Sequence, residues 1–166
     1  MNSEEPETLL VIEPSAEAPR NSEGSIVKLQ DGRLALAYTR FTGGGGDHDR
    51  AHISLRLSAD GGQTWSADRC LTGGESGMNE MSVSLLRLDD GDILFGHMRK
   101  QSLSDCRFYV RRSEDELDSF GEPVCATPRV AYQVINNDRL TQLSTGRLVL
   151  PAAYHDALRT HIAPVA

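Results

Sequence analysis

Short apolar runs separated by polar, glycine-containing turns cover most of the chain, a pattern typical of β-strands. Three segments share one plan: an apolar strand, a tight turn that ends in glycine, and a second apolar strand. They cover residues 25–40, 84–99 and 139–154. The turn glycines are Gly32, Gly91 and Gly146, which are 59 and 55 residues apart. Glycine accepts the positive φ that such turns need, so each segment predicts a β-hairpin.

The regular spacing indicates a repeated module. One hairpin cannot bury its own apolar faces, so several copies must stack to form a core. In the first repeat we expect four strands, at about residues 25–30, 33–40, 51–58 and 67–71. In the second we expect strands at about 83–88, 92–99, 107–113 and 122–126. The third repeat contributes its first two strands.

A distinctive turn follows the third strand of the first repeat. It fits the pattern S-x-D-x-G-x-T-W, known as the Asp-box, with Ser58, Asp60, Gly62, Thr64 and Trp65. The aspartate accepts backbone N–H bonds, the glycine allows a reversed dihedral, and the tryptophan packs between sheets. A degenerate copy at 113–120 keeps Ser, Asp, a small hydroxyl residue and an aromatic residue but has neither glycine. We predict a structural role for both turns.

The hairpins, the long segment between the second and third strands, and the Asp-box together resemble the sialidase (neuraminidase) superfamily over residues 22–155. Its members are six-bladed β-propellers with BNR/Asp-box repeats. The resemblance implies an all-β fold, a partial six-bladed sialidase-type β-propeller with about two and a half blades. The expected divisions are an N-terminal tail, 1–21, and a propeller domain, 22–166, with blades at about 22–75, 79–127 and 134–160. The apolar run at 9–12 in the tail is a candidate ring-closing strand.

The composition of the chain limits the kinds of partner that it can have. The 166-residue chain has a net charge of −7 and no long basic run, which argues against nucleic acid. No apolar run is long enough to span a membrane, and no signal peptide is visible, so we expect a cytoplasmic protein. The three cysteines lack metal-ligand spacing, and the three adjacent residues at 47–49 cannot easily face one ion. We therefore expect no metal and no cofactor.

Members of the resembled family cleave terminal sialic acids with retention. They use three arginines to clamp the sugar carboxylate, an aspartate as general acid, and a tyrosine nucleophile activated by glutamate. Arg40 ends a predicted strand, and Asp47 and Asp49 follow in the loop where the family carries its acid. The resemblance therefore makes Asp47 the candidate acid and Asp49 the second choice. The tyrosine, its glutamate and the later arginines would belong to blades outside this sequence.

One departure from the family concerns the first clamp arginine. Family members have Arg-Ile-Pro before the first strand, whereas this chain has Ser22-Glu23-Gly24. Glu23 suits the hydroxyls of a neutral sugar better than a carboxylate, which places sialic-acid specificity in question. The leading prediction is a glycoside hydrolase of sialidase type acting on a terminal sugar. The alternatives are a non-catalytic carbohydrate-binding propeller and an inactive truncated product.

Residues that precede the first strand of each repeat are expected to form the ligand face of the ring. Further substrate-binding candidates follow from this rule and from the repeat itself, in which Arg40 and Arg99 each lie eight residues after a turn glycine. They are Glu23, Arg40, Arg99, Asp105, Arg107, Asn136, Asp138 and Arg139. The alternatives are solvated strand ends, a local ion pair between Asp105 and Arg107, and loop residues that bond the backbone.

Overall fold

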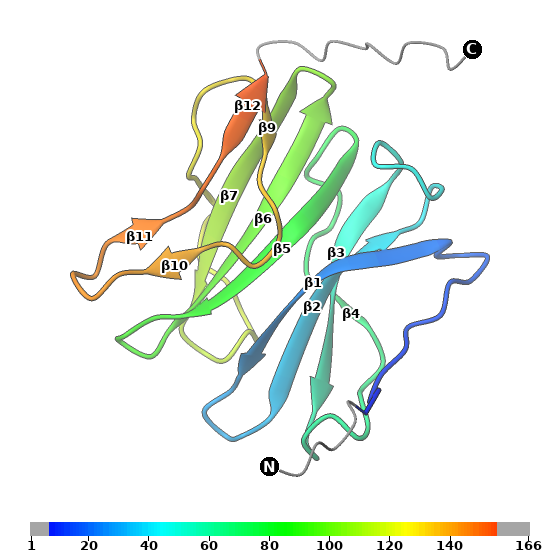
Figure 1. Cartoon of the computed structure of the whole chain (residues 1–166), viewed down its shortest axis with the longest axis vertical. Helices are drawn as coiled ribbons and strands as arrows, with labels where there is room; N and C mark the ends of the chain where they lie inside the picture. The colour runs from blue at the N-terminus through cyan, green and yellow to red at the C-terminus, as the bar shows by residue number, and fades with distance from the viewer. Residues whose placement is uncertain (1–6, 156–166) are drawn as a thin grey trace.

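Every regular element in residues 7–155, the part of the chain described by the computed structural model, is a β-strand (Figure 1). This confirms the all-β fold class. The first two hairpins lie in separate neighbouring sheets and not in one continuous sheet, as the repeat predicts.

The first sheet, called blade 1, has four antiparallel strands in sequence order. They are β1 (Arg20–Lys28), β2 (Leu34–Phe41), β3 (Ala51–Ser58) and β4 (Arg69–Cys70). Blade 2 repeats this order with β5 (Asn79–Arg87), β6 (Ile93–Ser102), β7 (Asp105–Ser113) and β8 (Val124–Cys125). Figure 1 shows the blades side by side, with β1 next to β5.

Apolar side chains from the facing sides of the two blades form the main core. Its fully buried members include Ala37, Ile53, Leu85 and Phe95. Alternate residues of each strand point to opposite faces, so the same strands present a second face to their other neighbours. A smaller core of Met98, Cys106, Phe108 and Ile135 lies on the other side of blade 2.

Strands β1 and β5 begin about four to five residues earlier than the sequence predicts. Each contains an irregularity, between Ser22 and Ser25 in β1 and between Met81 and Ser84 in β5. A bulge interrupts the period-two pattern and re-aims the residues before it. The residues before each bulge therefore do not continue the alternation of apolar and polar residues by which a strand is predicted from sequence.

The third repeat forms shorter strands. They are β9 (Tyr132–Val134), β10 (Thr141–Gln142), β11 (Leu148–Val149) and β12 (Ala153–His155). β10 pairs with β11 around the predicted turn glycine, whose φ is 79°, and β12 pairs with β9. β9 also lies parallel to β7 and pairs with it at Cys106 and Tyr132. The third hairpin is thus present, but each of its strands is broken into two pieces.

The two turns with the Ser-x-Asp pattern have the same hydrogen bonds. In the first, Ser58 Oγ accepts from Gly62 N (2.8 Å) and Asp60 accepts from the N–H (2.9 Å) and hydroxyl (2.6 Å) of Thr64. In the second, Ser113 Oγ accepts from the amide of residue 117 (2.8 Å), and Asp115 accepts from the amide (2.8 Å) and hydroxyl (2.5 Å) of residue 119. Both turns are local structural units.

Serines at equivalent places in β1 and β5 connect successive repeats. Ser25 Oγ accepts a hydrogen bond from Leu85 N (2.8 Å) and donates one to Asp138 Oδ1 (2.7 Å). Ser84 Oγ accepts one from Arg139 N (3.1 Å). Each serine therefore ties its own strand to the next repeat, where the three repeats converge.

Candidate functional site

A cavity of about 270 Å³ lies where the three repeats converge. We call it the Lys100 cavity. Its polar lining comes from blade 1, from blade 2 and from the start of the third repeat. The lining residues are Glu23, Asp47, Met81, Ser82, Met98, Lys100, Cys106, Tyr132, Gln133, Val134, Ile135 and Asn136. A concave site at a junction of repeats, with a few polar groups among apolar ones, is the usual form of a small-ligand pocket.

Lys100 is the most buried charged group of this cavity, with an exposed fraction of 1%. Its Nζ donates to the main-chain oxygen of Asp47 and lies 3.4 Å from Nδ1 of His48. The Tyr132 ring lies 5.5 Å from the same nitrogen. Burial lowers the pKa of Lys100 from its usual value, while the nearby Asp47 and Glu23 carboxylates favour the charged form.

Asp47 lies at the tip of the loop between β2 and β3. Its Oδ1 accepts a hydrogen bond from Arg20 (2.5 Å), the first residue of β1, whose guanidinium also covers the Phe41 ring at 4.4 Å. This hydrogen bond is the main cause that holds the pKa of Asp47 below its usual range. The carboxyl group is therefore ionised at neutral pH.

Blade 2 fixes the loop that carries Asp47. Asn79, at the start of β5, donates from its side chain to the main-chain oxygens of Asp47 and Asp49, both at 2.9 Å. Within the loop, Asp49 Oδ2 accepts from Gly46 N (2.7 Å). The carboxylate of Asp49 thus caps a turn of the loop and is not among the residues that line the cavity.

Glu23 supplies the second carboxylate of the Lys100 cavity. It has a φ of 57°, in the left-handed region, and accepts hydrogen bonds from Thr39 Oγ1 (3.2 Å) and Ser82 N (3.4 Å). Burial raises the pKa of Tyr132 to about 12 and that of Cys106 to about 11. The phenol and the thiol are therefore neutral lining groups at physiological pH.

Three of the predicted site residues come together in this cavity: Glu23, Asp47 and Asn136. Asn136 and Arg139 also line an adjacent cavity of about 340 Å³ beside residues 151–153. The side chain of Asp138 accepts the hydrogen bond from Ser25 described above.

The remaining predicted residues have other partners. Arg40 is paired with Asp68, and Arg107 is paired with Asp105 at 2.8 Å. Arg99 is paired with Glu75 and covers the Tyr109 ring at 4.5 Å. These charges are thus held in separate ion pairs.

Sequence reasoning missed Arg20, Lys100 and Tyr132. Lys100 follows the smaller core residue Met98 by two positions in β6, so strand alternation alone puts both on one face. The repeat pattern points instead to the neighbouring Arg99, because Arg40 and Arg99 each lie eight residues after a turn glycine. No group of three His, Cys, Asp or Glu side chains that could hold a metal occurs within residues 7–155. The same range contains no helix long and apolar enough to cross a membrane.

The repeated four-stranded sheets, packed side by side with their first strands adjacent, define the chain as part of a β-propeller. No protein-family model and no curated protein matches it. Among solved structures, it is similar to a Hadza microbial sialidase, Hz136 (TM-score 0.68, 16% identity, 83% of this chain and 33% of that one).

Two further solved structures are similar to the chain. One is a protein of unknown function from Dyadobacter fermentans (TM-score 0.66, 19% identity, 84% and 48% covered). The other is an endo-arabinase from Bacteroides thetaiotaomicron (TM-score 0.62, 15% identity, 88% and 55% covered). The chain therefore spans between one third and about half of the length of these propellers. At these identities the likeness is one of fold.

Proposed function

We propose that the chain forms part of a propeller glycoside hydrolase that acts on a terminal sugar in the Lys100 cavity. The observation that carries the proposal is the presence of two carboxylates, Glu23 and Asp47, with a buried lysine in one cavity at the convergence of three repeats. Glycoside hydrolysis most often needs a pair of carboxyl groups on either side of the scissile bond. Further support comes from the similar structures, which include a sialidase, an endo-arabinase and a family-43 glycoside hydrolase.

The contacts suggest a division of roles. The hydrogen bond from Arg20 favours the ionised form of Asp47, which suits a base or a group that stabilises the cationic transition state. This differs from the general-acid role that the family resemblance implies for Asp47. In our proposal Glu23 is the second carboxyl group of the pair, and Lys100 positions the Asp47 loop through the main-chain oxygen.

We propose a neutral sugar as the preferred substrate. Around the cavity, the two carboxylates Glu23 and Asp47 are matched by the two cations Arg20 and Lys100. A sialic acid would add a further negative charge, and its carboxylate is best bound by converging guanidinium groups. Arg40 and Arg99 are instead paired with acidic residues. Sialidase activity is the alternative that a substrate panel decides.

The experiment measures hydrolysis of aryl glycosides of arabinose, galactose, glucose and sialic acid by the purified protein. Asp47→Asn and Glu23→Gln are each expected to lower kcat/KM by about 100-fold or more, the usual contribution of a positioned acid or base. Glu122→Gln is the matched control because Glu122 is exposed and distant from the cavity lining. Turnover that is unchanged in both site variants would contradict the proposal.

A non-catalytic sugar-binding propeller is the second candidate. It is favoured by the ion pair between Asp47 and Arg20, which occupies one carboxylate oxygen in the structure. Calorimetric titration with the unlabelled sugars separates the two functions. Binding that Glu23→Gln abolishes, without hydrolysis of any aryl glycoside, would establish the binder.

A further inference from the structure

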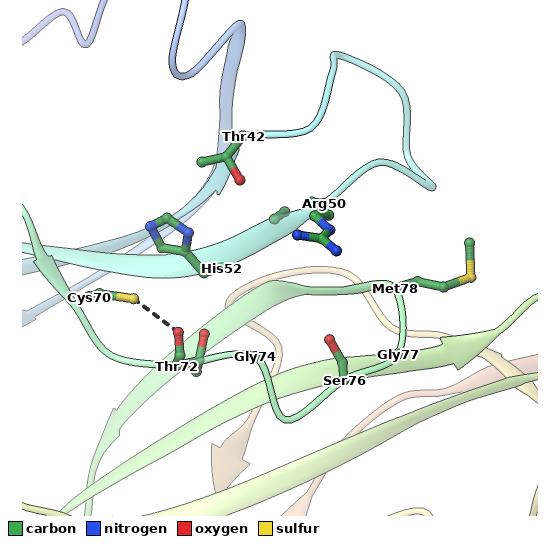
Figure 2. A pocket seen from close by; sticks show the side chains of 11 residues that line it. Thr42, Arg50, His52, Cys70, Thr72, Gly74, Ser76, Gly77 and Met78 are labelled. Atoms are coloured by element: carbon green, nitrogen blue, oxygen red, sulfur yellow. Dashed lines mark hydrogen bonds between the residues drawn. The ribbon is translucent and has the colours of Figure 1, made fainter.

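A second cavity, of about 380 Å³, lies between the base of the 42–50 loop and the segment 70–78 (Figure 2). We call it the Arg50 cavity. It shares no lining residue with the Lys100 cavity. Its lining residues are Thr42, Arg50, Ala51, His52, Cys70, Thr72, Gly73, Gly74, Ser76, Gly77 and Met78.

The lining of this cavity contains a cation and several hydroxyl groups but no carboxylate. Figure 2 shows the Arg50 guanidinium and the Ser76 hydroxyl pointing toward each other across the space, with His52 beside them on β3. Within residues 7–155, no acidic side chain lies within 4.0 Å of the Arg50 guanidinium, and none of its N–H groups makes a hydrogen bond to the protein. Arg50 is exposed, and its five N–H donors have no acceptor within this range.

Two acidic residues near the Arg50 cavity are paired with other arginines. Asp68 is paired with Arg40 and Arg56, and Glu75 is paired with Arg99. Arg50 therefore has no ion-pair partner among residues 7–155, and the carboxylate of the preceding Asp49 instead accepts from Gly46 N. The guanidinium is thus open to pairing with a negatively charged ligand.

His52 adds a neutral group to the site. Burial is the main cause that lowers its pKa, and the positive charge of Arg40 lowers it further. At neutral pH the imidazole therefore donates and accepts hydrogen bonds without adding a second charge.

The walls of the cavity are fixed by backbone contacts. Thr42 N donates to Arg50 O (2.8 Å), and a Cβ on Gly43 would lie 2.8 Å from Arg50 Cβ, so the loop base closes tightly. On the opposite wall, Gly77 N donates to Gln101 Oε1 (2.7 Å), and a Cβ on Gly77 would lie 2.6 Å from Gln101 O. These contacts hold the backbone on both sides of the cavity in place.

We infer that the Arg50 cavity binds an oxyanion carried by a saccharide, either a carboxylate or a sulfate ester. The guanidinium of Arg50 forms paired hydrogen bonds with the oxyanion, and Ser76, Thr42 and His52 bond its remaining oxygens or the sugar hydroxyls. Because Asp47 is at the tip and Arg50 at the base of one loop, a single glycan can contact both cavities. The saccharide part of this inference rests on the proposed function, whereas the oxyanion part does not.

The test is calorimetric titration of the 166-residue protein with methyl glucuronide, glucose 6-sulfate and methyl glucoside. The two anionic sugars represent the two sources of an oxyanion, and the uncharged glucoside is the reference. We expect at least one anionic sugar to bind, with an affinity that falls as the salt concentration rises. Arg50→Gln is expected to weaken this binding by about tenfold or more, the usual effect of removing a charge-assisted hydrogen bond.

Two control variants make the outcome decisive. Arg33→Gln removes a partly exposed arginine that is paired with Asp31 in the first hairpin turn, and it should bind as the unmodified protein does. Glu122→Gln, at an exposed position outside both cavity linings, should also retain oxyanion binding. This binding readout does not depend on turnover, so it stays informative if the glycosidase proposal fails. Equal binding of the anionic sugars by Arg50→Gln and the unmodified protein, or no binding by either, would overturn the inference.

Discussion

At the scale of single residues, the two Ser-x-Asp turns reach one geometry with different side chains. The first turn has Gly62 at φ 98°, whereas the second has Leu117 at φ 74°, where a side chain is strained. Leu117 is fully buried in the core between the blades, so burial offsets the strain. At the first turn, a Cβ on Gly62 would lie 3.3 Å from Leu9 Cδ1 of the N-terminal segment. Leu9 thus occupies the space next to a glycine that has no side chain of its own.

Truncation of Leu117 tests the contribution of this side chain. Leu117→Ala is expected to lower the free energy of unfolding by about 2–5 kcal/mol, as for other buried leucines. Urea denaturation followed by tryptophan fluorescence measures the change. Leu103→Ala is the control because Leu103 is 44% exposed, and it should change stability by less than about 0.5 kcal/mol. Equal losses in the two variants would show that Leu117 is not part of the core.

The sequence predicts the side-chain hydrogen bonds of these turns but not the buried leucine of the second turn. The spacing of Ser113, Asp115 and Ser119 indicates the hydrogen bonds, because they depend on local side chains. A leucine with positive φ is visible only when the neighbouring blade that receives it is known. Glu23 and Asp47 could likewise be proposed for the site from the sequence. The ion pair between Asp47 and Arg20 could not, because it becomes visible only when the arrangement of the strands is known.

At the scale of elements, β6 is an inner strand of blade 2 and has two different faces. Phe95 packs against blade 1, while Met98 faces the smaller core beside the third repeat. Gly96 lies on the second face, where a Cβ would be 2.5 Å from Phe108 Cζ. Because that space belongs to an aromatic ring, glycine is required here for packing and not for a turn.

A methyl group at this position is expected to overpack the strand. Gly96→Ala should lower the free energy of unfolding by about 1–3 kcal/mol, because the Phe108 ring must move. Thermal and urea unfolding measure the loss. Gly121→Ala is the matched control, since a Cβ there would be 3.6 Å from its nearest neighbour. A Gly96→Ala variant as stable as the control would show that the ring moves without cost.

The hairpins were predictable from the sequence because their turn glycines and apolar alternation are local signals. The segments before Ser25 and Ser84 were not predicted as strand, because the bulges break the alternation. The third hairpin was predicted to be continuous, whereas its strands are interrupted between residues 134 and 141 and between 149 and 153. Apolar residues of this hairpin, such as Leu148 and Val149, are exposed, so no packing enforces a continuous strand.

At the scale of the whole molecule, polar groups are buried beside the core between the blades. His97 is fully buried, stacks on Phe95 at 4.8 Å, and accepts a hydrogen bond from Arg99 Nε at its Nε2 (3.2 Å). Its Nδ1 has no hydrogen-bond partner among the described residues. Burial, aided by the positive charges of Arg99 and Arg111, lowers the pKa of His97 to about 3.

This histidine makes stability depend on pH. Below about pH 6.5 the unfolded chain binds a proton at His97 that the folded chain does not bind until about pH 3, so stability falls as the pH decreases through this window. The slope from one such proton approaches about 1.4 kcal/mol per pH unit. His97→Gln should remove that slope when unfolding is measured at about pH 7 and about pH 5. His155→Gln, at an exposed position, is the control and should leave the slope in place. A slope that His97→Gln also leaves unchanged would show that His97 is not its cause.

The serine hydrogen bonds from Ser25 to Leu85 and from Ser84 to Arg139 have an evolutionary consequence. The first two repeats each carry the serine that bonds to the following repeat, so tandem duplication of the coding segment copies this hydrogen bond together with the blade. A duplicated repeat can then pack against its neighbour through contacts that already exist. The stability of repeat proteins is approximately the sum of the stabilities of the repeats and of the contacts between neighbouring repeats. Rings with different numbers of blades can therefore arise from one ancestral module.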